Sequence, residues 1–128
     1  MKLDANVRYA PSHEWARKDG TEFVVGISDH AQESLGDIVF VDLPKVGSVF
    51  KQTASFGTVE SVKAASDVNL PVGGKITAIN EQLADQPDLI NKDCYGEGWF
   101  VRVLPDNPGE WDTLLVPADY EKTVEAEE

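Results

Sequence analysis

Apolar and polar residues alternate over short stretches of this chain, a pattern that predicts half-buried β-strands. Residues Glu14 to Lys18 and Thr21 to Ile27 form two such stretches. Asp19-Gly20 lies between them and favours a tight hairpin turn, because both central positions of that turn need positive φ. Two later stretches, Phe56 to Val62 and Ala64 to Val72, predict a second hairpin with one lysine between its strands. Hairpins are therefore the main predicted building unit.

The helical signals are short and lie between the strands. Asp29 with Gln32 three residues later fits a capping box, and Gly36 is a natural C-terminal cap, so we expect a helix of about two turns. Residues Asp37 to Leu43 are rich in Val, Ile and Phe, which predicts a strand covered on both faces. Asn107-Pro108 predicts the start of another helix.

Many short strands separated by turns roughly every eight to twelve residues predict an all-β sandwich or barrel, not a βαβ sheet. The length of 128 residues predicts a single domain, residues 1–128. The acidic end of the chain is predicted to fray from about residue 124.

The chain is strongly acidic, with 23 acidic and 11 basic residues and a net charge of −12. This charge repels phosphate backbones and favours basic partner surfaces, so we expect no nucleic-acid partner and a monomer with transient complexes. No apolar run approaches the roughly 20 residues of a membrane span, so we expect no membrane contact. The first residues show no signal core or transit segment. We therefore expect a bacterial cytoplasmic protein, or a mitochondrial-matrix protein if the chain is processed.

Residues suited to catalysis or metal binding are sparse. Cys94 is the only cysteine, which excludes an internal disulfide, and no activating neighbour is visible beside it. His13 and His30 are too few for a histidine cluster. A mixed His/carboxylate site stays open, but no ligand spacing suggests one. No nucleophile–base pair or phosphate loop is visible, so we expect no catalytic residue and no enzyme activity.

A tight turn would hold Lys63, the lysine of the second predicted hairpin, out in solvent. A lysine that serves as the attachment point for a long prosthetic group needs such an exposed position. The segment Glu60-Ser61-Val62-Lys63-Ala64-Ala65-Ser66-Asp67 resembles the lipoyl-lysine site of glycine cleavage system H proteins. Biotin carriers place methionines on both sides of their lysine, whereas this chain has Val62 and Ala64 there. The segments that also resemble the family, in the family's order, are Tyr9 to Trp15, Val25 to Gln32, Leu35 to Pro44, Leu89 to Asp93 and Tyr95 to Trp99.

The resemblance implies a flattened barrel-sandwich hybrid of the lipoyl/biotinyl-carrier type, with short peripheral helices and lipoic acid joined to Lys63 by an amide. It implies a carrier of aminomethyl groups from a pyridoxal-phosphate glycine decarboxylase to a tetrahydrofolate-dependent aminomethyltransferase. Dihydrolipoamide dehydrogenase would take up the electrons, and a lipoylating enzyme would be a fourth partner. Cys94 departs from the family, which usually has proline there, and we expect it to alter only a loop.

Further residues acquire candidate roles from their place in these motifs. Glu60 is a candidate for recognition by the lipoylating enzyme, although a plain surface charge is the preferred explanation. We hypothesise that Glu14, Asp67 or both hold the lipoyl arm on the protein surface when it carries the positively charged aminomethyl group. A carboxylate in a partly desolvated cleft stabilises a positive charge. The alternative is that both are ordinary solvated carboxylates, or that Asp67 has an N-cap-type role in its turn. The residues that form the context of Lys63 in the hairpin are Glu60, Ser61, Val62, Ala64 and Ser66.

Two other functions stay open at this point. A lipoyl relay protein, which donates its group to other lipoate-dependent complexes, would use the same Lys63. A non-catalytic interaction module would make Lys63 dispensable. Replacing Lys63 would therefore abolish the function of a lipoyl carrier or relay protein but leave that of an interaction module intact.

Overall fold

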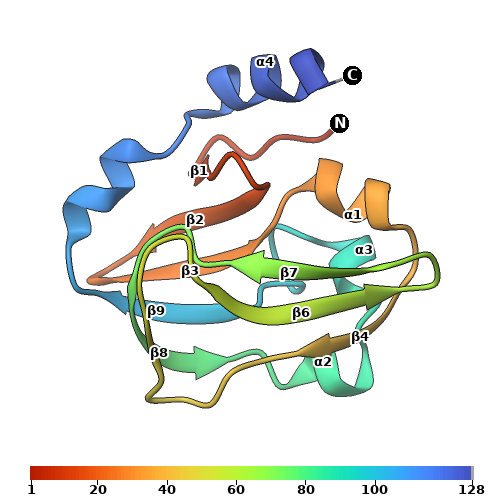
Figure 1. Ribbon diagram of the computed structural model, residues 1–128, viewed down its shortest axis with the longest axis horizontal. Helices are drawn as coiled ribbons and strands as arrows, with labels where there is room; N and C mark the ends of the chain where they lie inside the picture. The colour runs from red at the N-terminus through yellow and green to blue at the C-terminus, as the bar shows by residue number, and fades with distance from the viewer. Residues whose placement is uncertain (128) are drawn as a thin grey trace.

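The computed structural model describes residues 1–127 and shows two β-sheets with short helices around them (Figure 1). The first sheet has the order β1 (Val7–Tyr9), β2 (Glu14–Asp19), β3 (Glu22–Ile27), β9 (Val101–Pro105), β8 (Gly74–Ile79) and β5 (Val49–Phe50). The second sheet has the order β4 (Ile38–Asp42), β6 (Ser55–Ser61) and β7 (Ala65–Asn69). Within the described chain the sheets do not close into a barrel, and the predicted mostly β sandwich is confirmed.

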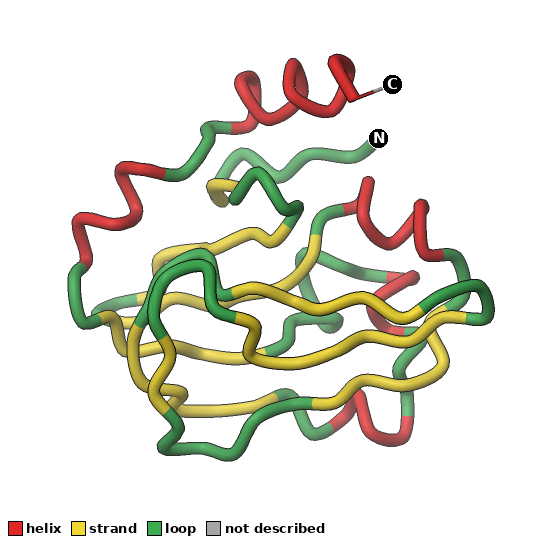
Figure 2. Tube along the Cα trace, viewed as in Figure 1, coloured by secondary structure: helices red, strands yellow, loops and turns green. Residues whose placement is uncertain are grey.

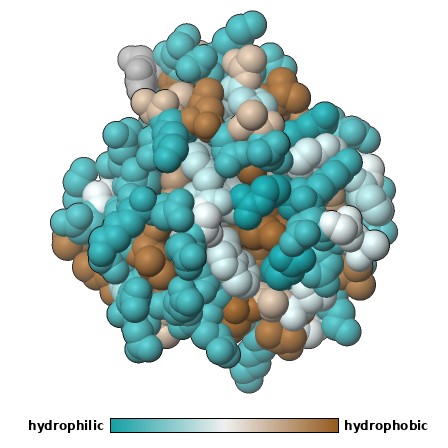
Figure 3. All heavy atoms as spheres, turned by 180° about the vertical axis from the view of Figure 1, so that it is seen from behind, coloured by the Kyte–Doolittle hydropathy of each residue, from teal (hydrophilic) through white to brown (hydrophobic). Residues whose placement is uncertain are grey.

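The helices are short and sit at the periphery of the strands, as the red segments of Figure 2 show. They are α1 (Asp29–Leu35), α2 (Gln82–Asp85), α3 (Leu89–Lys92), the 3₁₀ helix η1 (Pro108–Thr113) and α4 (Pro117–Glu127). None of the helices within residues 1–127 combines the length and the apolar character that crossing a bilayer requires. The face seen in Figure 3 is largely hydrophilic with small separate hydrophobic patches, in keeping with the net charge of −12.

The main core lies between the two sheets. Apolar side chains from both sheets meet there, and each contributes about 1.5–3 kcal/mol when fully buried. The buried side chains of this core include Val25, Ile27, Ile38, Val41, Phe56, Val59, Val68, Leu70, Ile76, Phe100, Val101 and Val103. Because β6 and β7 supply several of them, the base of the second hairpin is anchored in this core, and its far end is bonded through the Val62 N–H to the Asp37 carbonyl at 3.0 Å.

The last described helix extends into the region that was predicted to fray from about residue 124. Helix α4 runs to Glu127, and Tyr120 and Val124 on it are buried. These two residues are four apart and share one helix face, which packs on β1. The Tyr120 ring stacks on Tyr9 with centroids 4.1 Å apart. Tertiary packing of this face outweighs the acidic composition of the segment.

The first hairpin forms as predicted, but its turn is shifted by one residue. Asp19 pairs with Glu22, so the two central residues are Gly20 and Thr21. Only Gly20 has positive φ, at 65°, which is the pattern of a type II′ turn and not of a turn with two positive φ angles.

The predicted helix cap is shifted in the same way. Ser28, and not Asp29, is the N-cap of α1, and its hydroxyl accepts from the Ala31 N–H at 3.1 Å. Gln32 instead donates from its side chain to the Asp29 carboxylate at 2.9 Å. Gly36 caps the other end of α1 with φ 78°, as predicted.

Strand β4 is buried on one face only, so the prediction of cover on both faces is wrong. Ile38 and Val41 are buried, whereas Val39 and Phe40 are 54% and 52% exposed. A register shift between Ile38 and Phe40 marks a bulge against β6, and a bulge breaks the two-residue alternation of a strand. Residues three apart therefore share the inner face, and Phe40 turns outward.

Candidate functional site

The far end of the β6–β7 hairpin presents Lys63. Glu60 pairs with Ala65, and the Ser61 N–H donates to the Ala64 carbonyl at 2.8 Å, which leaves Val62 and Lys63 at the tip. The Ser61 hydroxyl accepts from the N–H groups of Lys63 and Ala64 at 3.2 and 3.1 Å. Serine side chains favour turns through such local bonds. These bonds shape a tight tip with an exposed lysine on it.

The side chain of Lys63 lies alongside the last turn of α1. Its Nζ donates to the Ser34 carbonyl at 3.5 Å, which is at the outer limit for a hydrogen bond and contributes little. The amine is therefore accessible to an enzyme, and the bonds that shape the turn do not depend on it.

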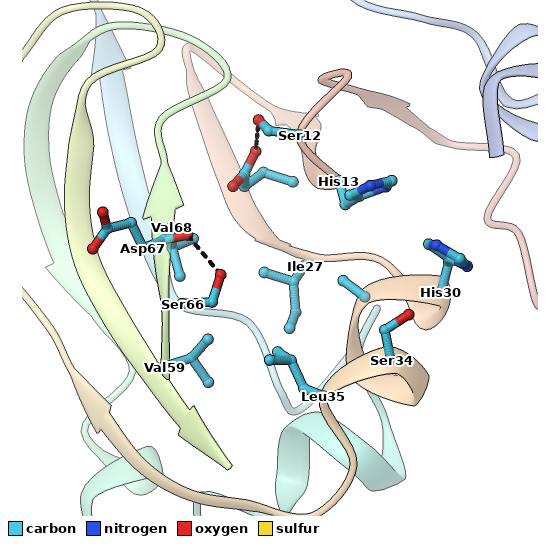
Figure 4. A pocket seen from close by; sticks show the side chains of 12 residues that line it. Ser12, His13, Ile27, His30, Ser34, Leu35, Val59, Ser66, Asp67 and Val68 are labelled. Atoms are coloured by element: carbon cyan, nitrogen blue, oxygen red, sulfur yellow. Dashed lines mark hydrogen bonds between the residues drawn. The ribbon is translucent and has the colours of Figure 1, made fainter. Parts of the chain in front are cut away.

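A cavity of about 200 Å³ lies between α1 and the β6–β7 hairpin (Figure 4). Ser34 both lines the cavity and contacts Lys63, so the cavity is within reach of a group attached there. Its walls combine apolar side chains with a polar end. The lining residues are Ser12, His13, Glu14, Ile27, His30, Ala31, Ser34, Leu35, Val59, Ser66, Asp67 and Val68.

Glu14 is the carboxylate most deeply placed in this lining, at 2% exposed. The Ser12 hydroxyl donates to one carboxylate oxygen, and the Asn69 N–H donates to the other at 2.9 Å. Burial raises the pKa of Glu14, while these hydrogen bonds lower it in part. A positive charge close to a buried carboxylate would favour its ionised form.

The predicted site residues divide into two groups. Glu14, Ser66 and Asp67 all line the cavity, but Glu60, Val62 and Ala64 lie on the outer parts of the hairpin. The hydroxyl of Ser66 donates to the carbonyl of Asp67 at 3.3 Å.

The side chain of Asp67 does not point into the cavity. Ser66 pairs with the buried Val59 and shares its inner face, whereas Asp67 pairs with Thr58 one position further on. Figure 4 shows the Asp67 carboxylate pointing away from the cavity. Asp67 therefore contributes its backbone to the lining, and Glu14 provides the facing carboxylate.

Sequence reasoning missed the contribution of α1 to the cavity. Ala31, Ser34 and Leu35 recur at a spacing that places them on one face of a helix, and this was the available signal. Ser12 and His13 directly precede Glu14 but carried no signal of their own. Burial lowers the pKa of His13, and the nearby Glu127 carboxylate offsets this in part.

The outer face of the β4–β6–β7 sheet carries an exposed aromatic ring among acids. Phe40 pairs with Glu60, and in the next row Asp42 pairs with Thr58, which pairs with Asp67. Phe40 is 52% exposed, and Glu60 belongs to the strand that leads to the lysine tip. This face, defined by Phe40, Asp42, Glu60 and Asp67, combines three carboxylates with one exposed aromatic ring.

Comparison with known proteins gives a consistent set of relatives. A family model described as glycine cleavage H-protein matches residues 7–127. The glycine cleavage system H protein of Carboxydothermus hydrogenoformans is 50% identical over 95% of this chain and 94% of its own length. The mitochondrial one of Flaveria trinervia is 49% identical over 94% and 73%. The crystal structure of a glycine cleavage system H protein from Mycobacterium marinum is 36% identical, with a TM-score of 0.88 over 96% and 99%.

Proposed function

This chain belongs to the glycine cleavage H-protein family, and we propose that Lys63 is the residue that bears its lipoyl group. The protein is a lipoyl carrier of the glycine cleavage system. The observation that carries the assignment to Lys63 is the exposed amine at the hairpin tip beside the cavity. When bound, the lipoyl group supplies a disulfide that accepts an aminomethyl group and two electrons.

The surroundings of Lys63 suit acylation of its amine. Among the described residues, Nζ makes one hydrogen bond, to the Ser34 carbonyl at a marginal 3.5 Å, so forming an amide there sacrifices little. The turn itself is held by Ser61 and the backbone, and keeps its shape when Nζ is modified. Lys63 thus acts as a tether, which raises the local concentration of the attached group at each partner.

The cavity suits an arm with an apolar chain and a cationic cargo. Ile27, Leu35 and Val59 offer apolar walls, and Glu14 offers a buried carboxylate. We propose that Glu14 holds the positive charge of the aminomethyl cargo, while the cavity walls keep water away from it. Opposite charges attract more strongly in a partly desolvated site than in bulk water.

We propose that the partners are the glycine decarboxylase, the aminomethyltransferase, dihydrolipoamide dehydrogenase and the lipoylating enzyme, and that this chain catalyses none of their steps. The acidic outer face with Phe40 supports docking to basic partner surfaces, because complementary charge steers association. An exposed aromatic ring near the lysine supplies the apolar anchor that interfaces favour.

The assignment to Lys63 is tested by intact-protein mass spectrometry with peptide mapping. Incubation with a lipoylating enzyme, lipoate and ATP is expected to add one lipoyl group to the parent protein, located on Lys63. The same addition is expected for Lys45→Arg, which changes an exposed lysine elsewhere. A Lys63→Arg protein that still gains the mass increment would refute the assignment.

Phe40→Ala is expected to weaken docking to the glycine decarboxylase without weakening the fold. The ring is half exposed, so the free energy of unfolding should change little, whereas an anchor of an interface costs more than about 1 kcal/mol when truncated. We expect kcat/KM for the lipoylated protein as substrate to fall at least about fivefold. Val49→Ala, an exposed apolar residue on β5, is the matched control. Equal kinetics for the two variants would rule out this role.

A further inference from the structure

Three potential metal ligands from distant parts of the chain converge at one edge of the cavity. His13 lies in the loop between β1 and β2, His30 in the first turn of α1, and Glu127 at the end of α4. Their ligand atoms all lie within 4.8 Å of one another. We propose that His13, His30 and Glu127 form a binding site for a divalent transition-metal ion, with Zn²⁺ the best-suited ion.

The spacing of the donors is close to what zinc requires. Zn–N and Zn–O bonds of about 2.0–2.1 Å place two ligands of a tetrahedral site about 3.3 Å apart. His13 Nε2 and Glu127 Oε2 are 3.3 Å apart. The His13 and His30 rings have centroids 5.0 Å apart, and Figure 4 shows the two rings side by side at the edge of the cavity. The ligand nitrogen of His30 lies within 4.8 Å of the other two ligand atoms, and metal binding requires this half-buried side chain to move closer.

Neighbouring residues hold His13 in the orientation of a ligand. Its Nδ1 lies 2.7 Å from the Tyr120 hydroxyl, which in turn lies 2.7 Å from the Ser28 hydroxyl. When Tyr120 donates to Ser28, the Nδ1–H of His13 donates to Tyr120, and Nε2 keeps its lone pair for a metal. Histidine ligands of metals are typically fixed through the other ring nitrogen in this way.

The backbone of His13 is an independent sign of a specialised position. Its φ is 84°, a left-handed conformation that is uncommon for a residue other than glycine. The His13 N–H donates to the Ala10 carbonyl at 3.0 Å, and its own carbonyl accepts from the Ser28 N–H at 2.9 Å. The surrounding structure thus imposes a costly conformation that directs this side chain toward His30 and Glu127.

The donor set selects the class of ion. Two imidazoles and one carboxylate suit zinc and its neighbours, whereas calcium and magnesium prefer oxygen ligands throughout. Three protein ligands leave one coordination position for water. Such an ion joins α4 to α1 and to the β1–β2 loop, and it stabilises the folded chain by binding that state alone. None of these contacts involves Lys63, but His13 and His30 also line the cavity proposed for the arm, so the site is tested on the unlipoylated protein.

The test uses unlipoylated, tag-free protein titrated with Zn²⁺ by calorimetry and with Co²⁺ by visible absorption. We expect one ion per chain, a tetrahedral Co²⁺ spectrum and a rise of the thermal midpoint with Zn²⁺. His30→Ala and Glu127→Gln are each expected to weaken binding about tenfold or more. Glu125→Gln removes the same charge from an exposed position on α4 and should bind like the parent.

Both ligand variants change residues that are at least partly exposed, and circular dichroism without metal checks that they fold like the parent. The proposal is overturned if the parent binds no stoichiometric ion. It is also overturned if the folded His30→Ala and Glu127→Gln proteins bind Zn²⁺ as tightly as Glu125→Gln does.

Discussion

Lys63→Arg is expected to reduce glycine cleavage in a reconstituted system to the level measured without this protein, a loss of about 100-fold or more. A guanidinium does not form the amide that attaches the arm, although it keeps the length and charge of the side chain. Lys63 lies at an exposed hairpin tip, so the free energy of unfolding should stay within about 0.5 kcal/mol of the parent's. The measurement is the rate of CO₂ release from glycine with all partners present.

A matched variant distinguishes loss of the tether from loss of a positive charge or a general defect. Lys45→Arg makes the same chemical change at another exposed position and should support the parent's rate. Full activity of Lys63→Arg would instead favour the interaction-module function, in which this lysine is dispensable. Thermal unfolding of both variants shows whether any loss of rate reflects the fold.

The lysine hairpin was predictable because the information that forms it is local. Alternating residues define its two strands, and Ser61 closes the tip with bonds to residues two and three positions away. The same alternation also indicates which side chains face inward. Val68 is buried on the inner face, so its neighbour Asp67 must face outward, and this is where its carboxylate lies.

The cavity was not predictable in this way because it is assembled from distant segments. Helix α1 closes one side, β7 the other, and Glu14 enters from β2, so its shape depends on how these elements pack. The exposure of Phe40 follows from a bulge, which an alternating pattern does not reveal. The packing of helix α4 also depends on distant residues, since Tyr120 and Val124 are buried against a surface formed by β1.

Glu14→Gln is expected to shorten the lifetime of the aminomethyl cargo on the lipoylated protein by about 10- to 100-fold. This range corresponds to losing one hydrogen bond to a charged group, about 1.5–3 kcal/mol. The introduced amide retains an oxygen that accepts a hydrogen bond from Ser12 or Asn69, so the cavity keeps its shape while the negative charge disappears. The measurement is the rate at which the isolated loaded protein releases its cargo.

The pH dependence of release gives a second readout with a defined sign. Burial raises the pKa of Glu14, so the carboxylate takes up a proton at a higher pH than an exposed glutamate does. Only the ionised form holds the cation, and release from the parent should therefore accelerate as the pH falls through this pKa. In Glu14→Gln the acceleration over the same pH range should be absent, because the titrating group is gone.

Asp67→Asn is the matched control that decides which carboxylate holds the cargo. It removes the same charge from a residue that also lines the cavity, but its carboxylate points to the outer face. We expect its release rate to stay within about twofold of the parent's, because an exposed charge is screened by solvent. A large effect of Asp67→Asn with a parent-like Glu14→Gln would transfer the role to Asp67. Parent-like lifetimes for both variants would show that retention depends on the walls of the cavity and not on charge.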